Sequence, residues 1–504
     1  ETGVRVNRPN LFPKVKNIGT YPPGTDFKAN EGTTPSGTDI KDNENGYDIY
    51  TTVINANRKC KRLIYQGDIA FKVGRNAYSC TDCLWPKSSS GIVNVPYVLS
   101  SDYSDSDISI ITAAMQEFMT LTCVNFVSRS VETDYLDIKP NDGCWSFIGM
   151  THGVQTVSLS QGGCIRHGTV QHELNHALGF LHEQCRSDRD DYVTIMTQYI
   201  SPDKMGNFNK ENTNNLGIEY DYSSVMHYSR YAFSNTPGQA TIVPKPDPNV
   251  PIGQSYGLSS LDVSKINRLY ECDICSSLLV DSSGTFTSAN YPSAYLNNAN
   301  CLWLIRAPEN KVFLTFETFN VQSSKNCASD YVTVYDGASK TSKVLLNRIC
   351  GSGISTPIVA SSNTMLVEFV SDGTITATGF KASYSTFYCG DSLTTSPGII
   401  TSPGYPNLYP SSVDCMWLIT GPPKAMILIK FDVFNLETND YCIYDYVRIY
   451  DGKTTSSPKL GTFCGKNSFN TVSFGNSMLV TFHSDNLNQY TGFHATYKFI
   501  QMNK

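Results

Sequence analysis

The sequence predicts an α+β domain, preceded by an irregular N-terminal segment and followed by two all-β modules. Residues 1 to about 57 are rich in Asn, Gly, Pro, Thr and Asp and have few clustered apolar residues, which is typical of loops. Residues 93–99 alternate like a strand, and residues 106–119 space their apolar side chains like an amphipathic helix. Beyond Cys275 the chain repeats itself in a register of about 114 residues.

Composition and charge narrow the class of protein. The chain has 504 residues, of which 40% are hydrophobic and 17% charged, as in folded multidomain proteins. A net charge of −6 gives no basic footprint for nucleic acid, and no apolar run is long enough for a membrane span. Sixteen cysteines predict a disulfide framework and therefore a secreted, extracellular protein, which we expect to be stored in secretory granules before release.

The C-terminal repeat is marked by cysteines, aromatic residues and turns. Cys301 and Cys415 each begin a Cys-x-Trp motif at equivalent positions of the repeat. Residues 312–316 and 426–431 alternate like strands. These features predict two all-β modules, and the repeat resembles CUB domains over residues 275–499.

Residues 172–182 form the pattern His-Glu-x-x-His-x-x-Gly-x-x-His. His172 and His176 are four residues apart, so on a helix their rings share a face and can point at one ion. Gly179 permits the positive φ that ends a helix and returns His182 toward the same ion. Three nitrogen ligands with one position left for water are typical of catalytic zinc, whereas structural zinc is usually closed by four protein ligands. The pattern therefore predicts one catalytic zinc ion.

Glu173 supplies the carboxylate that this chemistry needs. Zinc lowers the pKa of its bound water to about 7, and a neighbouring carboxylate takes the proton and delivers it to the leaving amine. We expect Glu173 to be this general base and acid in peptide-bond hydrolysis. The alternative is an amphipathic helix whose histidines fall at these positions without binding a metal.

Residues 224–228, with the sequence Ser-Val-Met-His-Tyr, form a second motif. Together with the zinc motif and Glu183, it resembles the methionine turn of the metzincins, and within that clan the astacin family, over residues 76–272. The resemblance implies an α+β metzincin protease domain in which Met226 packs beneath the metal. It also implies that Tyr228 binds zinc at rest and then swings to stabilise the oxyanion; a core aromatic residue is the alternative.

The N-terminal segment is similar to an astacin propeptide. Tyr65-Gln-Gly-Asp68 matches the family motif Phe-x-Gly-Asp except for Tyr65, which implies that Asp68 binds the zinc in the zymogen; an ordinary turn is the alternative. Arg75-Asn76 is the bond expected for a trypsin-like activating protease. The resemblance further implies that the new amino terminus at Asn76 pairs with Glu183, for which a surface salt bridge is the alternative.

Disulfide pairings are implied by both resemblances. The expected pairs are Cys80–Cys83, Cys123–Cys272, Cys144–Cys164, Cys275–Cys301, Cys327–Cys350, Cys389–Cys415 and Cys442–Cys464. For the first pair a redox-active function is the alternative. Cys60 and Cys185 remain, and we predict a disulfide between them that ties the propeptide to the protease domain. The alternatives are a zinc-binding Cys60 thiolate and free, intermolecular or reshuffled thiols.

Many CUB domains bind calcium through a glutamate and two later aspartates. The second module has all three residues, Glu437, Asp445 and Asp485, a hard oxygen set suited to Ca²⁺. In the first module Asp330 and Asp372 remain, but Gln322 stands where the glutamate is expected, so that site is predicted to be weak or missing. Carboxylates that only cap turns are the alternative in both modules.

Four segments follow from these patterns. They are a propeptide at 1–75, a protease domain at 76–272, and CUB modules at 275–388 and 389–499; Glu1-Thr2-Gly3 is interpreted as a cloning remnant. The expected function is a latent zinc endopeptidase of the hatching-enzyme type, because no EGF-like segment separates the protease from the CUB modules. Its expected partners are extracellular proteins, in particular egg-envelope glycoproteins. The alternatives are a tolloid-type matrix or procollagen-processing proteinase and a non-catalytic egg-coat-binding protein.

Overall fold

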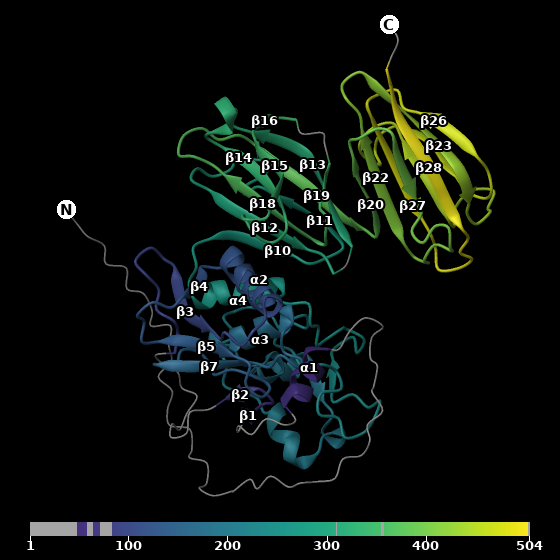
Figure 1. The fold of residues 1–504 in the computed structure, drawn as a ribbon. Coiled ribbons are helices and arrows are strands. Elements are labelled where there is room, and N and C mark those ends of the chain that lie inside the picture. The colour runs from purple at the N-terminus through teal and green to yellow at the C-terminus, as the bar shows by residue number, and fades with distance from the viewer. Residues whose placement is uncertain (1–47, 58–63, 71–82, 309, 354–356, 502–504) are drawn as a thin grey trace, which may run out of the picture. The chain divides into compact units, whose positions relative to one another are not determined.

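The computed structural model describes residues 48–57, 64–70, 83–308, 310–353 and 357–501 (Figure 1). The chain folds into the predicted α+β domain and two all-β sandwiches. The predicted activation bond Arg75–Asn76, together with Cys60 and Cys80, lies outside the described residues. No helix within the described residues is long and apolar enough to cross a membrane.

The α+β domain is built on a mixed sheet. Its strands are β3 (Val93–Leu99), β4 (Val124–Ser128), β5 (Tyr135–Lys139), β6 (Cys144–Trp145) and β7 (Val154–Leu159), in the order β4-β3-β5-β7-β6. Neighbouring strands are parallel except β6, which runs antiparallel to β7. The strand predicted at residues 93–99 is therefore confirmed. Its alternation places Val93 and Val95 in the core because successive side chains of a strand point to opposite faces.

Two long helices accompany this sheet. Helix α2 (Asp105–Leu121) begins at a capping box, in which Ser104 and Asp107 exchange hydrogen bonds, and confirms the helix predicted at residues 106–119. Helix α3 (His167–Ala177) contacts α2 and β7, and its residues 168–177 are all buried. A helix that is buried all round is held by packing rather than by its own propensity, which gives the side chains of α3 fixed directions.

Shorter elements complete the domain. They are η1 (Glu183–Cys185), η2 (Arg189–Asp191), β8 (Val193–Ile195), η3 (Thr197–Tyr199), η4 (Pro202–Phe208), β9 (Ile242–Pro244) and α4 (Ser260–Leu269). Strands β8 and β9 pair antiparallel.

The described part of the N-terminal segment is more regular than its composition predicts. Residues 49–57 were expected to form loops, but they form helix α1 (Ile49–Asn57), which contacts α3 and β6. The prediction was wrong because Ile49 and Val53, four residues apart, form a short apolar face that packs into the α+β core. Downstream, β1 (Ile64–Tyr65) and β2 (Ile69–Ala70) form a tight hairpin.

The first β-sandwich contains strands β10 (Cys275–Leu279), β11 (Ser283–Thr287), β12 (Asn300–Arg306), β13 (Lys311–Val321), β14 (Tyr331–Asp336), β15 (Lys343–Ile349), β16 (Gly351–Ser352), β17 (Ile358–Val359), β18 (Thr364–Val370) and β19 (Gly379–Phe387). They form sheets of order β10-β12-β18-β14-β15 and β11-β19-β13-β16, with β17 beside β13. The strand predicted at residues 312–316 lies within β13.

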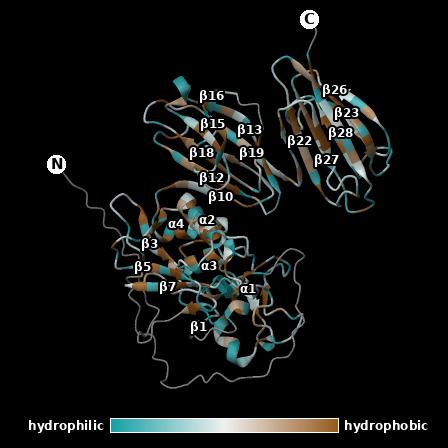
Figure 2. Ribbon diagram, in the orientation of Figure 1, coloured by the Kyte–Doolittle hydropathy of each residue, from teal (hydrophilic) through white to brown (hydrophobic). Residues whose placement is uncertain are grey.

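The second β-sandwich contains β20 (Cys389–Leu393), β21 (Gly398–Thr401), β22 (Asp414–Thr420), β23 (Ala425–Asn435), β24 (Tyr446–Tyr450), β25 (Lys459–Phe463), β26 (Phe469–Val472), β27 (Ser477–His483) and β28 (Gly492–Gln501). Its sheet orders, β20-β22-β27-β24-β25 and β21-β28-β23-β26, repeat those of the first sandwich. Trp303 and Trp417 pack against Phe380 and Phe493 at equivalent positions. Figure 2 shows apolar residues, in brown, recurring along the strands of both sandwiches.

Disulfides cross-link each part. The structure contains the expected pairs Cys123–Cys272, Cys144–Cys164, Cys275–Cys301, Cys327–Cys350, Cys389–Cys415 and Cys442–Cys464. Cys83 is also disulfide-bonded.

Candidate metal centre

Helix α3 and the turn after it direct three imidazoles to one point. His172 and His176 lie one helical turn apart on α3. Gly179, just after the helix, has φ of +108°, a conformation that side chains rarely adopt, and the chain then reverses to bring His182 to the other two rings. All three rings are buried. The helix-and-hinge arrangement expected from the spacing is therefore present.

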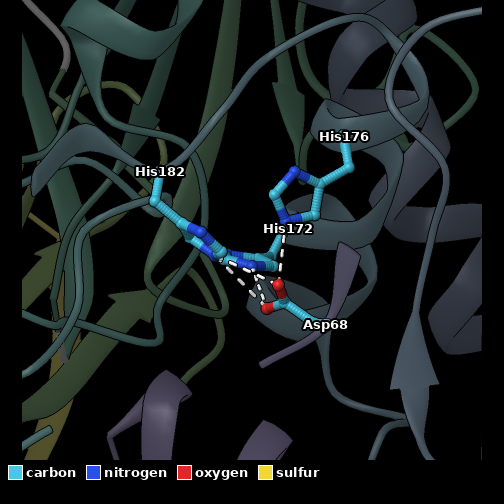
Figure 3. A group of neighbouring side chains, drawn as sticks. All are labelled: Asp68, His172, His176 and His182. Atoms are coloured by element: carbon cyan, nitrogen blue, oxygen red, sulfur yellow. Dashed lines mark hydrogen bonds and ion pairs between the residues drawn. The ribbon is translucent and has the colours of Figure 1, made fainter. Parts of the chain in front are cut away.

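The β1–β2 hairpin delivers Asp68 to the same point. Gln66 and Gly67 both have positive φ, of 48° and 91°, which makes the turn tight enough to project the Asp68 carboxylate. The Asn57 amide donates hydrogen bonds of 2.7 Å to the carbonyls of Gly67 and Cys144, so α1 fastens the turn to β6. Figure 3 shows Asp68 facing all three histidine rings.

The spacing of the four side chains suits a metal ion with tetrahedral coordination. The Asp68 carboxylate lies 3.0 Å from Nε2 of His172, 3.4 Å from Nε2 of His176 and 3.2 Å from Nε2 of His182. Ligand atoms that surround zinc tetrahedrally at about 2.0–2.1 Å are themselves about 3.3 Å apart. The observed separations thus fit a zinc ion among these atoms.

Hydrogen bonds on the opposite ring nitrogens orient the imidazoles. Nδ1 of His172 donates to the carbonyl of Val225 at 2.8 Å, and Nδ1 of His176 donates to that of Phe180 at 2.8 Å. Nδ1 of His182 is 3.1 Å from the Gln66 side-chain oxygen. Each Nε2 therefore carries no proton, and its lone pair is free to bind a metal. This is the tautomer that a metal ligand needs.

The charge state of the site also favours a cation. Burial lowers the pKa of His176 and lowers that of His182 to about 4, so these rings are neutral at neutral pH. Burial raises the pKa of Asp68, but the surrounding imidazoles outweigh burial and hold it well below its usual value. An ionised carboxylate therefore lies beside the neutral rings of His176 and His182. Oδ1 of Asp68 and Nε2 of His176 have no hydrogen-bond partner among the described residues, as expected of atoms reserved for a metal.

Glu173 lies next to this centre on α3 and is fully buried. Neither of its carboxylate oxygens has a hydrogen-bond partner among the described residues. Burial, with the charge of Asp68 as a second cause, raises the pKa of Glu173 well above its usual value. A buried acid with a raised pKa and no structural partner suits proton transfer rather than structural pairing.

The segment from Val225 to Tyr228 borders the histidines. Met226 is buried, and its carbonyl accepts a 3.0 Å hydrogen bond from the amide of Glu183. The Tyr228 ring lies 4.7 Å from the His182 ring, and its hydroxyl donates to the carbonyl of Gln66. In this form of the chain the Tyr228 hydroxyl is therefore engaged by the N-terminal segment.

Glu183 lies in a buried ion-pair network. Its carboxylate accepts hydrogen bonds from Lys265 at 2.7 Å, from Arg186 at 3.1 Å and from the amide of Asp221 at 2.9 Å. The alternative of a salt bridge thus describes this form of the chain, although the bridge is buried rather than at the surface. The predicted partner, Asn76, lies outside the described residues.

The predicted Cys60–Cys185 disulfide is not formed. Within the described residues, Cys185 is a free, fully buried thiol, and Cys60 lies outside them. The Cys185 sulfur is 3.6 Å from the carbonyl oxygen of Asn207. Burial raises the pKa of the Cys185 thiol, so it stays protonated and unreactive at neutral pH. Counting leftover cysteines misled the prediction because a buried cysteine often serves only as a small apolar residue.

A second cluster lies in the C-terminal sandwich. The carboxylate oxygens of Glu437, Asp445 and Asp485 lie within 4.8 Å of one another. Asp445 accepts hydrogen bonds from the Tyr409 hydroxyl and the amide of Asp485, and Oε2 of Glu437 has no partner among the described residues. These oxygens are close enough to share one hard cation.

The equivalent place in the first sandwich is closed by an amide. Asp330 accepts hydrogen bonds from the Tyr295 hydroxyl and the amide of Asp372, as in the second sandwich. The Gln322 amide satisfies its neighbours when its nitrogen is the atom 3.2 Å from Asp330 and 2.9 Å from the carbonyl of Ile375, and we assign that orientation. A neutral donor thus takes the place of the third carboxylate.

Sequence reasoning missed the residues that hold Asp68 in place. Asn57, Gln66 and Glu211 contact the hairpin or the histidines, although neither the composition nor a known motif singles them out. The Tyr65 hydroxyl, which departs from the Phe of the family motif, was the available signal, because a hydroxyl that is partly withdrawn from water calls for a partner.

Comparison with known sequences identifies the families of the protease domain and of the two β-sandwiches. The sequence pattern of the peptidase family Astacin matches residues 82–271, and that of the CUB domain matches 275–384 and 389–497. The chain is 52% identical over 456 residues to Embryonic protein UVS.2 of Xenopus laevis, covering 90% of this chain and 88% of that protein. It is also 52% identical over 338 residues to Astacin-like metalloendopeptidase of Gallus gallus, covering 67% of this chain and 83% of that protein.

Among solved structures, High choriolytic enzyme 1, a hatching enzyme zinc-protease from Oryzias latipes, is 50% identical, covers 39% of this chain and 100% of its own, and has a TM-score of 0.38. The identity with UVS.2 extends over nearly the whole chain, and the His-His-His-Asp cluster has the donor set and spacing for zinc. The chain belongs to the astacin family and is a zinc metalloendopeptidase that carries two CUB domains.

Proposed function

We propose that the chain is a secreted zymogen whose own Asp68 closes the catalytic site. The observation that carries this proposal is the contact of the Asp68 carboxylate with Nε2 of His172, His176 and His182. These four side chains hold zinc in the latent form, and the three histidines hold it after activation. When bound, zinc lowers the pKa of its water to about 7 and polarises the scissile carbonyl.

The residues around the centre carry out the proton transfers and stabilise charge. Glu173 accepts the proton of the attacking water and passes it to the leaving amine, a function that its raised pKa supports. Departure of the propeptide frees the Tyr228 hydroxyl from Gln66, so it becomes available to stabilise the oxyanion. Met226 is buried in the segment that borders the histidines and would form part of the wall of the site.

Activation requires cleavage at Arg75–Asn76 by a trypsin-like protease, which separates the propeptide (1–75) from the protease domain (76–272). The new amino terminus then joins the buried carboxylate of Glu183, which Lys265 and Arg186 neutralise in the latent form. An additional cation at this place stabilises a carboxylate whose pKa burial raises. The CUB domains occupy 275–388 and 389–499.

The second CUB domain binds calcium through Glu437, Asp445 and Asp485. The unpartnered, buried Oε2 of Glu437 supports this assignment, because a buried anionic oxygen without a donor is costly. Calcium serves structure or substrate binding, since this cluster contains no histidine or proton donor suited to catalysis.

The substrates are extracellular proteins, in particular egg-envelope glycoproteins, as expected of a hatching-type protease. The name of the Xenopus laevis relative, an embryonic protein, supports a function in the egg or embryo. The disulfides support secretion, and storage in granules before release fits a protease that is made latent. A tolloid-type matrix proteinase is the second candidate, favoured by the shared protease and CUB domains.

One experiment tests the catalytic assignment. The purified chain is activated with immobilised trypsin, the trypsin is removed, and hydrolysis of a quenched fluorescent peptide is followed. We expect activity in the wild type and a loss of about 10²- to 10⁴-fold in Glu173→Ala, with zinc content unchanged. Hydrolysis that persists in Glu173→Ala, or a wild type that binds zinc but cleaves no peptide, contradicts the proposal.

A further inference from the structure

The propeptide hairpin is held by one acidic residue of the protease domain that the metal chemistry does not use. Oε1 of Glu211 accepts a hydrogen bond of 2.8 Å from the Tyr65 hydroxyl and one of 3.3 Å from the Gln66 side-chain amide. The backbone amide of Glu211 donates to the carbonyl of Cys185 at 2.7 Å, which ties it to the segment just after His182. Glu211 is thus fixed beside the cleft that the hairpin fills.

Glu211 lies close to the reacting centre along the bound chain. Tyr65 and Gln66 precede Asp68 by three and two residues, and Asp68 contacts the histidines themselves (Figure 3). The amide of Gln66 bridges the two places, because its nitrogen faces Glu211 and its oxygen faces Nδ1 of His182. Any peptide that follows this path past the metal presents a side chain to the same carboxylate.

The departure of the propeptide leaves this carboxylate without its donors. Within the described part of the chain, no Lys, Arg or His forms an ion pair with Glu211; the neighbouring Lys210 pairs with Asp190 instead. The side chain is half-buried, so solvent screens it incompletely. A cationic side chain is the strongest available partner, because hydrogen bonds between charged groups are about twice as strong as neutral ones.

We propose that Glu211 is a substrate-recognition residue that selects a Lys or Arg side chain within about three residues of the scissile bond, at a position the propeptide fills with Tyr65 and Gln66. This inference rests on the proposed protease function and adds its substrate class. It also explains why this propeptide has Tyr where the family motif has Phe, because a Phe at position 65 lacks the hydroxyl that donates to Glu211.

The test uses the activated full chain after removal of trypsin. Quenched peptides differ only in carrying Lys, norleucine or Glu at each of three positions on either side of the cleaved bond, and kcat/KM is measured. In the wild type we expect Lys to exceed norleucine by about tenfold at one position. In Glu211→Gln, kcat/KM for the Lys peptide falls to about the value for the norleucine peptide, whereas Glu211→Lys prefers Glu at the same position.

Glu219→Gln is the matched control, because Glu219 is an exposed residue of the same segment, and it should retain the Lys preference. An unchanged preference in Glu211→Gln, or a wild type that cleaves all peptides equally, overturns the inference and leaves the protease function standing. A binding assay separates the inference about Glu211 from the protease function. A labelled peptide with the sequence of residues 64–70 should bind activated Glu173→Ala about tenfold more tightly than the same protein carrying Glu211→Gln; equal affinities overturn the inference whatever the activity.

Discussion

The protease centre and the second CUB domain both gather side chains around a place for a divalent cation, but with different chemistry. The protease centre combines three imidazoles with one carboxylate and is almost completely buried. The CUB cluster consists of carboxylates alone, and Glu437 and Asp485 are partly exposed. Nitrogen-rich tetrahedral sites suit zinc, whereas sets of hard oxygens suit calcium, so the ions proposed for the two clusters differ.

The two clusters also differ in which ligand can leave. The hairpin that carries Asp68 is joined to the protease domain by backbone hydrogen bonds of Asp68 and Ala70 with Ser146. The side chains of Asn57, Tyr65 and Gln66 add further hydrogen bonds. In the CUB domain, Asp445 and Asp485 are joined by a hydrogen bond between neighbouring parts of one sandwich. In the proposed function, the first arrangement is a switch and the second is a permanent site. The predictions below test this difference.

The largest expected effect is the loss of latency in Asp68→Ala. Removing one partner of a buried charged group costs about 3–5 kcal/mol, which corresponds to about 10²- to 4 × 10³-fold in the occupancy of the closed state. The uncleaved variant should therefore hydrolyse a quenched peptide that the uncleaved wild type leaves intact. Asp48→Ala is the matched control, because Asp48 caps α1 and contacts none of the histidines. A silent, intact Asp68→Ala zymogen that still binds zinc argues against the switch.

The protease centre was more predictable than the hairpin that closes it. The spacing of His172, His176 and His182 follows from helix geometry and a hinge glycine, and that relation is local in sequence. The hairpin depends on contacts such as Tyr65 with Glu211, separated by 146 residues, which no local pattern encodes. Helix α1 was missed for the same reason, since its apolar face has meaning only against the core that it covers.

The CUB repeat and Cys185 show what sequence patterns can and cannot predict. The repeat made the two all-β modules visible, because their cysteines, aromatic residues and turns occur twice in one register. The disulfide pairings and the calcium candidates came from the resemblance to CUB domains. The fate of Cys185 could not be predicted, because no pattern distinguishes a packed thiol from a paired one. Sequence patterns thus predict sites whose residues lie close together in the chain or occur in a repeat. They do not predict a single contact between residues that are far apart in the chain.

The permanent site should fail when one of its carboxylates is removed. Asp485→Ala deletes a ligand and also one negative charge from the cluster, so we expect calcium affinity to fall at least about tenfold. Isothermal calorimetry on the full chain measures this directly. Asp372→Ala removes the equivalent residue of the first CUB domain and should leave calcium binding unchanged. Equal affinity in Asp485→Ala and the wild type excludes this cluster as the site.

A gain of binding is the reciprocal test in the first CUB domain. Gln322→Glu replaces an amide that donates to Asp330 with a third carboxylate. We expect the calcium stoichiometry to rise from one to two, with the new site about tenfold weaker than that of the second domain because its remaining geometry evolved around an amide. Gln322→Met, which removes the amide without adding charge, is the control. A stoichiometry that stays at one in Gln322→Glu shows that more than this residue separates the two domains.

The smallest expected effect is a pH dependence of calcium stabilisation. Burial raises the pKa of Asp445, and the charges of Asp485 and Glu437 raise it further. A carboxyl whose folded-state pKa is raised contributes stability below its unfolded pKa, near 4, and loses that contribution as the pH rises through the folded-state value. The metal-free second CUB domain therefore carries uncompensated repulsion between its carboxylates at neutral pH, and calcium would relieve it.

At pH 7 saturating calcium should raise the melting temperature by about 5 °C. That increase should shrink steadily toward pH 4, because protons then compete for the same oxygens. Scanning calorimetry of the full chain with calcium or with chelator, at several pH values, measures the effect; in Asp485→Ala the calcium-dependent increase should be small at every pH. A calcium-dependent increase that grows on acidification contradicts the carboxylate cluster as its source.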